Sequence, residues 1–202
     1  MKRQGIRCLS IEEVKMLLNY LSDKKSLERE YFLIDLVLQT GLRIAEVHTL
    51  NVGDVMNKKK LEIIGKGDKS RSVPLNSEAR KHTEYYLNCK RKRGESLELD
   101  APLFISRNGN RLSVRAIQRA FERVLKESGI NNHYTFHSLR HTFATETLKA
   151  DRNIRTVQEL LGHSRLDTTM VYTYVNDEDK QRAVDALSTA YKGQKAALET
   201  SI

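Results

Sequence analysis

The sequence predicts a mainly helical α+β fold with a small three-stranded antiparallel β-sheet. Only two prolines and ten glycines interrupt its 202 residues, so helices can extend over most of the chain. Apolar residues recur at helical spacing in most segments, whereas residues 54–75 change to short β-prone pieces. With 39% hydrophobic residues, the chain can form one core of ordinary domain size.

The first helix is predicted by a capping box at Ser10–Glu13. Val14, Leu17, Leu18 and Leu21 follow at the spacing of one helix face. The same reasoning predicts further helices over residues 28–39, 43–50, 77–92, 113–128, 136–149, 153–161, 167–175 and 178–191.

The three predicted strands cover residues 54–56, 61–64 and 71–75. Asn57-Lys58 and Gly65-Lys66-Gly67-Asp68 supply the turns between them. A surface loop is expected around residues 94–102, followed by a brief extended piece over 103–106.

The charge balance favours a polyanionic partner. The chain has 35 Lys and Arg against 26 Asp and Glu, a net charge of +9, which points to nucleic acid first. A well-solvated basic protein without such a partner would show the same balance. The basic runs Lys58–Lys60 and Lys90–Arg93 are likewise either solvated surface or contacts to DNA phosphates.

Cys8 and Cys89 have neither CxxC nor Cys/His spacing. This argues against a disulfide framework or a structural zinc site and fits a reducing compartment. The sequence shows neither a signal peptide nor a run of about 18 apolar residues. The expected location is therefore the cytoplasm, at the nucleoid in a bacterium.

Several residues have the chemistry needed to break a DNA phosphodiester without a metal. The transition state gathers negative charge, which arginine meets with a planar, permanently charged fork. His137 and Arg140 lie one turn apart on a predicted helix face. Lys66 lies in a glycine-flanked hairpin, and His163 follows a helix-ending glycine, nine residues before Tyr172. These residues could supply the acid, the base and the nucleophile of such a reaction.

Four segments, taken in order, resemble the successive boxes of the tyrosine recombinase (phage integrase) family. They are Thr40–Glu46, Ile64–Gly67, His137–His141, and Leu161–Ser164 with Thr168–Tyr172. Each box is moderately specific, but their combination in this order is very specific. The resemblance covers about residues 10–190 and implies the tyrosine recombinase catalytic-domain fold. The chain, 1–202, would then be a single catalytic domain, with a core over 10–175 and a C-terminal helix and tail over 176–202.

The resemblance implies a role for each matching residue. Arg43 and Arg140 would clamp the scissile phosphate, Lys66 would protonate the 5′-hydroxyl leaving group, His137 would assist proton transfer, His163 would bind a phosphate oxygen, Glu46 would support the site, and Tyr172 would be the nucleophile. Tyr174 is a rival, but the family spacing from the glycine–histidine turn favours Tyr172. Residues two apart on a helix point away from each other, so only one can attack.

The implied partner is double-stranded DNA, on which subunits that are monomers in isolation would assemble as a homotetramer. Accessory DNA-bending proteins are compatible with this arrangement, and neither a metal nor a cofactor is implied. DNA contacts are expected from polar residues of the helix 113–128 and of the hairpin: Arg115, Gln118, Arg119, Lys69 and Arg71. The apolar positions of that helix fit ordinary helix packing equally well.

The expected activity is site-specific recombination through a covalent 3′-phosphotyrosyl intermediate, giving integration, excision or inversion. The separate N-terminal DNA-clamping domain of typical members is expected to be absent, so the chain is either a fragment of a longer integrase or a short family member. A type IB topoisomerase would use the same chemistry to relax DNA. A non-catalytic DNA-binding module would fit the helix–turn–helix pattern of residues 153–175.

Overall fold

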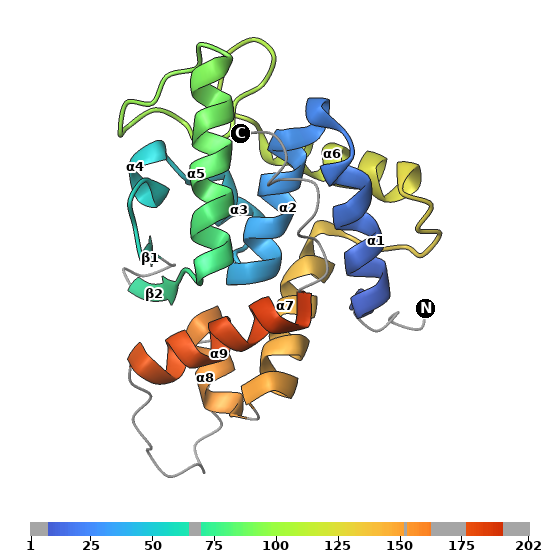
Figure 1. Ribbon diagram of the computed structural model, residues 1–202, viewed down its shortest axis with the longest axis vertical. Helices are drawn as coiled ribbons and strands as arrows, with labels where there is room; N and C mark the ends of the chain where they lie inside the picture. Colours follow the sequence, from blue (N-terminus) through green and yellow to red (C-terminus); the bar gives the residue numbers. More distant parts are fainter. Residues whose placement is uncertain (1–7, 65–69, 152, 163–176, 192–202) are drawn as a thin grey trace.

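The computed structural model describes residues 8–64, 70–151, 153–162 and 177–191. This part of the chain is mainly helical with one small antiparallel sheet, which confirms the predicted class (Figure 1). Its elements are α1 (Ile11–Ser22), a 3₁₀ turn η1 (Lys25–Leu27), α2 (Glu28–Thr40), α3 (Ile44–Thr49), α4 (Val52–Val55), β1 (Lys60–Ile64), β2 (Ser70–Pro74), α5 (Ser77–Lys92), α6 (Val114–Glu127), α7 (Phe136–Asp151), α8 (Ile154–Leu161) and α9 (Asp177–Tyr191). No described helix is long and apolar enough to cross a bilayer.

Helix α2 is the central element of the fold. It lies between α1 and α5 (Figure 1) and also contacts α7, so every residue from Glu30 to Thr40 is buried. Its buried polar groups are paired, as burial requires. Asp35 accepts hydrogen bonds from Gln39 and lies 2.7 Å from His82 Nδ1, while Glu30 pairs with arginines of α6 and of its own first turn.

The sheet has two described strands, and the predicted third strand over residues 54–56 is wrong. β1 and β2 pair antiparallel, with Lys60 opposite Pro74 and Ile64 opposite Ser70. Residues 52–55 instead form α4, because Asp54 Oδ2 accepts the Asn51 N–H at 2.8 Å and caps a helical turn. Two backbone hydrogen bonds to the loop at Leu99 and Ala101 hold that turn in place.

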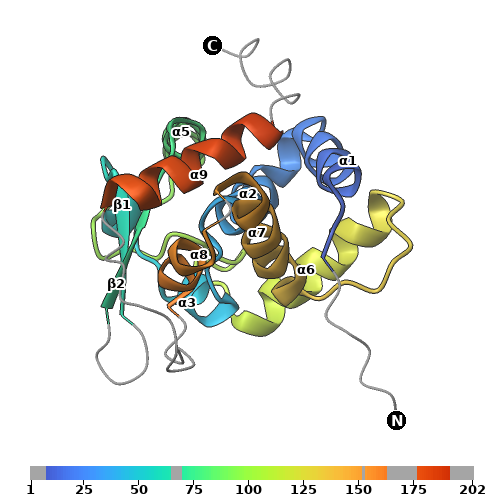
Figure 2. The ribbon, with the colours of Figure 1, turned by 90° about the horizontal axis from the view of Figure 1, so that it is seen from below.

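The last helices pack on one end of α2. α7 contacts both α2 and α9, and α8 lies between α7 and the sheet (Figure 2). α9 buries Ala183, Val184 and Leu187, and the Val184 carbonyl accepts a hydrogen bond from Asn76 at 3.1 Å. The predicted helix over 167–175 lies outside the described residues.

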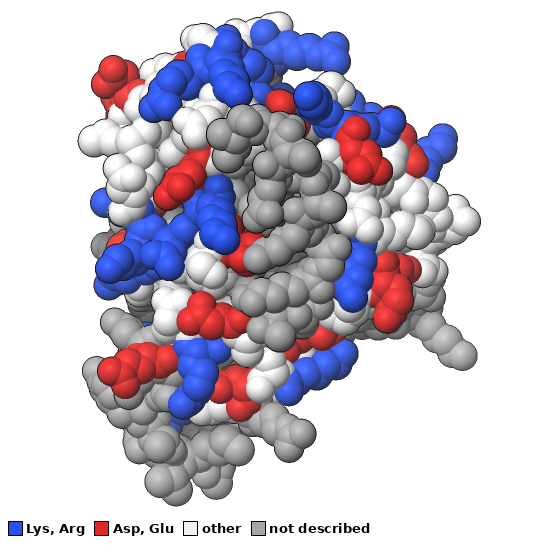
Figure 3. All heavy atoms as spheres, in the orientation of Figure 1, with Lys and Arg blue, Asp and Glu red and all other residues white. Residues whose placement is uncertain are grey.

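The two basic runs differ in their surroundings. Lys58–Lys60 is exposed beside the sheet, and Lys and Arg also gather over the end of α5 (Figure 3). Lys90 in that second run is only 1% exposed and pairs with Glu95 at 2.8 Å. Lys90 is therefore an internal ion-pair residue, which fits neither a solvated surface nor a phosphate contact.

Candidate active site

Arg43 lies where α2 turns sharply into α3. Gly41 ends α2 in the left-handed region, at φ 64°. Arg43 is the N-cap residue of α3, and its N–H donates to Glu46 Oε2 at 2.7 Å. Its guanidinium donates to Glu46 Oε1 at 2.9 Å while the side chain stays 42% exposed. Glu46 therefore fixes both the backbone and one edge of the guanidinium, and the rest of the Arg43 side chain remains accessible.

Arg71, from β2, joins the same carboxylate. Its Nη1 and Nη2 donate to the two Glu46 oxygens, each at 2.8 Å, in a bidentate pair. Burial alone would raise the pKa of Glu46, but the hydrogen bonds from Arg71 and from the Arg43 N–H outweigh it and lower the pKa to about 2. Glu46 is therefore a carboxylate at neutral pH.

Arg140, on α7, is the most buried arginine of the group, at 3% exposed. Its Nη1 donates to the Gly41 carbonyl at 2.6 Å and its Nη2 to the Leu161 carbonyl at 2.7 Å. A Cβ on Gly41 would lie 2.4 Å from Phe143 Cδ1, so glycine is needed for α7 to approach this turn. Burial and the nearby charges of Arg43 and Arg71 lower the pKa of Arg140 to about 10.

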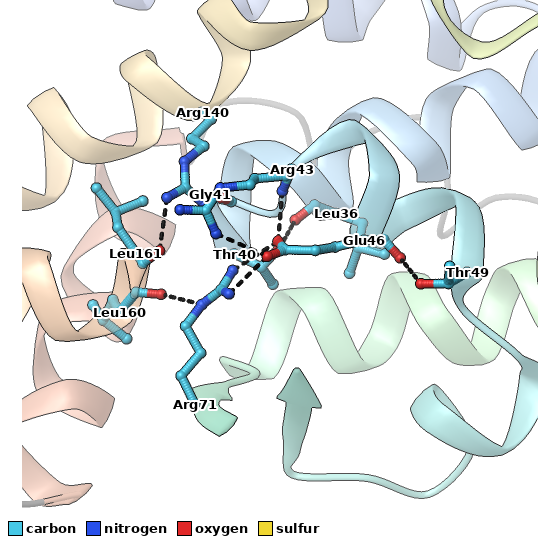
Figure 4. Close-up of polar contacts among 10 residues, drawn as sticks. All are labelled: Leu36, Thr40, Gly41, Arg43, Glu46, Thr49, Arg71, Arg140, Leu160 and Leu161. Carbon is cyan, nitrogen blue, oxygen red and sulfur yellow. Dashed lines mark hydrogen bonds and ion pairs between the residues drawn. The ribbon is translucent and has the colours of Figure 1, made fainter. Parts of the chain in front are cut away.

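Figure 4 shows Arg43 and Arg71 meeting at the Glu46 carboxylate, with Arg140 beside them directed at the Gly41 and Leu161 carbonyls. Three guanidinium groups and one carboxylate leave two positive charges in excess within this cluster. Arg140 uses two of its five guanidinium N–H groups on carbonyls. The remaining donors and the excess charge make the cluster suited to binding an anion with several oxygens, such as a phosphodiester.

His137 lies on α7 one turn before Arg140, as predicted, and is exposed. Its ring meets that of His141 edge to face, with centroids 4.6 Å apart. Burial and the positive charges of Arg140 and Arg43 lower the pKa of His137 below the ordinary value of 6.5. The imidazole is therefore mostly neutral at pH 7 and can accept a proton.

The other predicted catalytic residues, Lys66, His163 and Tyr172, lie outside the described residues, as do Tyr174 and Lys69. The described elements that flank them reach the cluster. β2 follows the Lys66 hairpin and carries Arg71, and α8 ends beside the arginines, with its Leu160 and Leu161 carbonyls accepting from Arg71 and Arg140.

Three of the predicted DNA contacts lie on α6, a helix that packs against α3 and α7. Arg115, Gln118 and Arg119 are exposed on that helix. Arg71, predicted from the sequence as a DNA contact, pairs with Glu46 in the structure, a pairing that sequence reasoning did not foresee. The signal in the sequence was weak, because Arg71 is separated by 25 residues from Glu46 and by 89 from Leu160.

Among the described residues there is no group of three or more His, Cys, Asp or Glu that could hold a metal ion. The described cluster itself is cationic, with three arginines and one carboxylate. Its chemistry rests on fixed guanidinium groups, which keep their charge at any physiological pH.

Comparisons with known proteins identify the relatives of this chain. The phage integrase family model matches residues 7–179. The tyrosine recombinase XerC of Proteus mirabilis is 36% identical over 191 residues, which cover 93% of this chain and 61% of that protein. XerC of Chlamydia pneumoniae is 41% identical over 157 residues, covering 76% and 49%. The chain thus spans about half to three-fifths of the length of these relatives.

Solved structures show the same fold. The XerA recombinase superposes with a TM-score of 0.69 at 32% identity, covering 97% of this chain and 66% of that one. The XerH site-specific recombinase, bound to a palindromic difH substrate in a post-cleavage complex, gives 0.69 at 26% identity and covers 82% and 48%. With the family match extending over most of its length, the chain belongs to the phage integrase family of tyrosine recombinases.

Proposed function

We propose that this chain is the catalytic domain of a site-specific recombinase that cleaves and rejoins double-stranded DNA through a covalent bond to Tyr172. The observation that carries the proposal is the arginine cluster, in which Arg43 and Arg71 share the Glu46 carboxylate and Arg140 lies beside them on the Gly41 carbonyl. Its excess positive charge matches the charge that develops on the non-bridging oxygens of a phosphodiester. XerC relatives and the DNA-bound XerH structure support the same activity.

In the proposed reaction, Arg43 and Arg140 hold the scissile phosphate. The Tyr172 oxygen attacks phosphorus while its proton passes to the neutral imidazole of His137. The bond from phosphorus to the 5′ oxygen breaks, and its electron pair stays on that oxygen. The oxygen then takes a proton from Lys66 and leaves as a 5′-hydroxyl. The 3′-phosphotyrosyl bond keeps the energy of the broken linkage, so a 5′-hydroxyl can reverse the step without ATP. His163 would donate a hydrogen bond to a phosphate oxygen.

A covalent-trapping assay tests this proposal. The protein is incubated in EDTA without ATP with nicked or supercoiled DNA that carries the region around its own gene, then denatured in SDS. Wild type should give a protein–DNA adduct that Tyr172→Phe abolishes and Tyr174→Phe retains. An adduct that is lost in Tyr174→Phe alone would keep the chemistry and change the nucleophile. A salt-sensitive complex without any adduct would favour a non-catalytic binding module.

The role of Lys66 has its own test. If sulfur replaces the bridging 5′ oxygen of the substrate, the cleaved strand leaves as a 5′-thiolate, and this leaving group needs no proton. Lys66→Ala should therefore fail on ordinary DNA and recover cleavage on the sulfur-bridged DNA. Failure on both substrates would assign Lys66 to another step.

We also propose that the subunits assemble as a tetramer on two DNA sites and work at the nucleoid, with DNA contacts from the exposed Arg115, Gln118 and Arg119 of α6. Analytical ultracentrifugation with and without DNA tests the assembly. Exchange of flanks between two marked DNA sites separates a recombinase from a topoisomerase, which would only relax supercoils.

A further inference from the structure

Arg71 is the arginine of the cluster whose guanidinium is most fully engaged by other parts of the chain. It donates through Nε to the Leu160 carbonyl at 2.9 Å and through Nη1 and Nη2 to Glu46 at 2.8 Å. All three of its guanidinium nitrogens are thus directed at protein oxygens, whereas Arg43 uses one such nitrogen on protein and Arg140 uses two. A contact to a DNA phosphate needs guanidinium donors that are not already engaged.

Resting on the proposed function, we infer that Arg71 is a positioning residue that sets Arg43 and the end of α8 for the cleavage step, and is not a DNA contact. The inference replaces the DNA-binding role expected from sequence.

The first effect of Arg71 is on Arg43. Its bidentate pair fixes both oxygens of Glu46, and the same two oxygens accept the Arg43 N–H and Nη1. The orientation of Arg43 therefore depends on the plane in which Arg71 holds the carboxylate. Lysine would keep the charge but present one ammonium group instead of the planar fork, so it could not hold both oxygens and the Leu160 carbonyl.

The second effect is on the end of α8. The Leu160 carbonyl is one of the last of the helix, and Gly162 caps it at φ 64°. A Cβ on Gly162 would lie 2.8 Å from Arg71 Cδ, so the chain passes directly over the arginine stem. Arg71 therefore ties β2 to the start of α3 and to the point where the chain leaves α8.

The test compares Arg71→Lys with Arg111→Lys in the full chain. Arg111 is a matched control because its guanidinium also holds α3, at the opposite end, through the His48 and Leu50 carbonyls and the Asn51 side chain. It has no contact with Glu46 among the described residues. Both variants keep the net charge, so a general loss of α3 support and a specific loss at Glu46 can be separated.

Three quantities are measured: hydrogen exchange of the Arg43 amide by NMR, the single-turnover rate of adduct formation, and DNA affinity as a function of salt. Arg71→Lys should speed exchange of the Arg43 amide about tenfold relative to core amides of α2, because that amide donates to Glu46. Cleavage should fall about 100-fold, as expected for a misplaced catalytic group. The DNA affinity of Arg71→Lys should stay within about threefold of wild type, with the same salt slope. Arg111→Lys should leave amide exchange at Arg43, the cleavage rate and the DNA affinity close to wild type.

The contrary results are distinct. Weaker DNA binding with a salt slope smaller by about 1 would make Arg71 a phosphate contact and overturn the inference. Unchanged exchange at Arg43, or an equal loss of cleavage in Arg111→Lys, would also overturn it. If wild type forms no adduct, the proposed function fails by itself, and the exchange data alone decide whether Arg71 positions Arg43.

Discussion

Replacing Glu46 by glutamine removes the carboxylate that Arg43 and Arg71 share. The carboxylate has a pKa of about 2 in the folded protein against an ordinary value of 4.5. This gap corresponds to roughly 3 kcal/mol at about 1.4 kcal/mol per pKa unit. Because the Arg43 edge of the cluster faces solvent, screening reduces it, and we expect Glu46→Gln to lower the free energy of unfolding by about 2 kcal/mol at pH 7.

The pH dependence gives the prediction its sign. The folded pKa lies below the unfolded one, so the stabilisation is fully present above about pH 4.5 and is lost as the pH falls toward 2. The difference between wild type and Glu46→Gln should therefore shrink to below about 1 kcal/mol at pH 3. Urea unfolding at pH 7 and pH 3 measures it, and the thermal midpoint at pH 7 should fall by about 6 °C.

Glu62→Gln is the control for this measurement. Glu62 also forms an ion pair, with Lys60 at 3.0 Å, but the two side chains are 57% and 54% exposed. Such surface pairs contribute little, so this variant should stay within about 0.5 kcal/mol of wild type at both pH values. Equal losses in the two variants, or a Glu46→Gln loss that does not shrink in acid, would refute the account of the cluster.

Three further predictions concern the catalytic step and the backbone around it. Arg140→Lys cannot bridge the two carbonyls and should slow adduct formation at least about 100-fold in a single-turnover assay, and a wild-type rate would contradict its role. Because the pKa of His137 lies below 6.5, the cleavage rate should rise with pH and level off by about pH 7. In His137→Gln this rise with pH should disappear, and a rise that persists would exclude the histidine as the base. Gly162→Ala places an alanine in the left-handed region and against Arg71, whereas the added Cβ of Gly129→Ala, at φ 79°, meets nothing within 4 Å. Gly162→Ala should therefore lower the free energy of unfolding in urea by about 1 kcal/mol more than Gly129→Ala, and equal losses would show that the clash relaxes.

Local signals in the sequence predicted most of the helices. The capping box at Ser10 and the helix-ending glycine before His163 mark helix ends through contacts within four residues, and both are present in the structure. The prediction of a third strand over 54–56 failed because Val55 favours a strand, whereas the Asp54 cap and two backbone hydrogen bonds to a distant loop favour a helical turn. Tertiary context outweighed strand propensity there.

The site could be predicted only in part, for a related reason. The pattern of residues identified Arg43, Glu46, His137 and Arg140, which the structure places around α3 and α7. The engagement of Arg71 could not be foreseen, because it depends on how β2, α3 and α8 pack. Pairings over such sequence distances leave no periodic signal for sequence patterns to detect.

Peptide mapping of the trapped adduct identifies the residue of this chain that carries the broken DNA strand. The adduct is digested with nuclease and protease, and mass spectrometry locates the tyrosine that carries a 3′-nucleotide. We predict one modified peptide, with the nucleotide on Tyr172. A nucleotide on Tyr174 would keep the chemistry and change the nucleophile, whereas a nucleotide on a residue other than tyrosine, or on no peptide of the chain, would rule out the phosphotyrosyl mechanism.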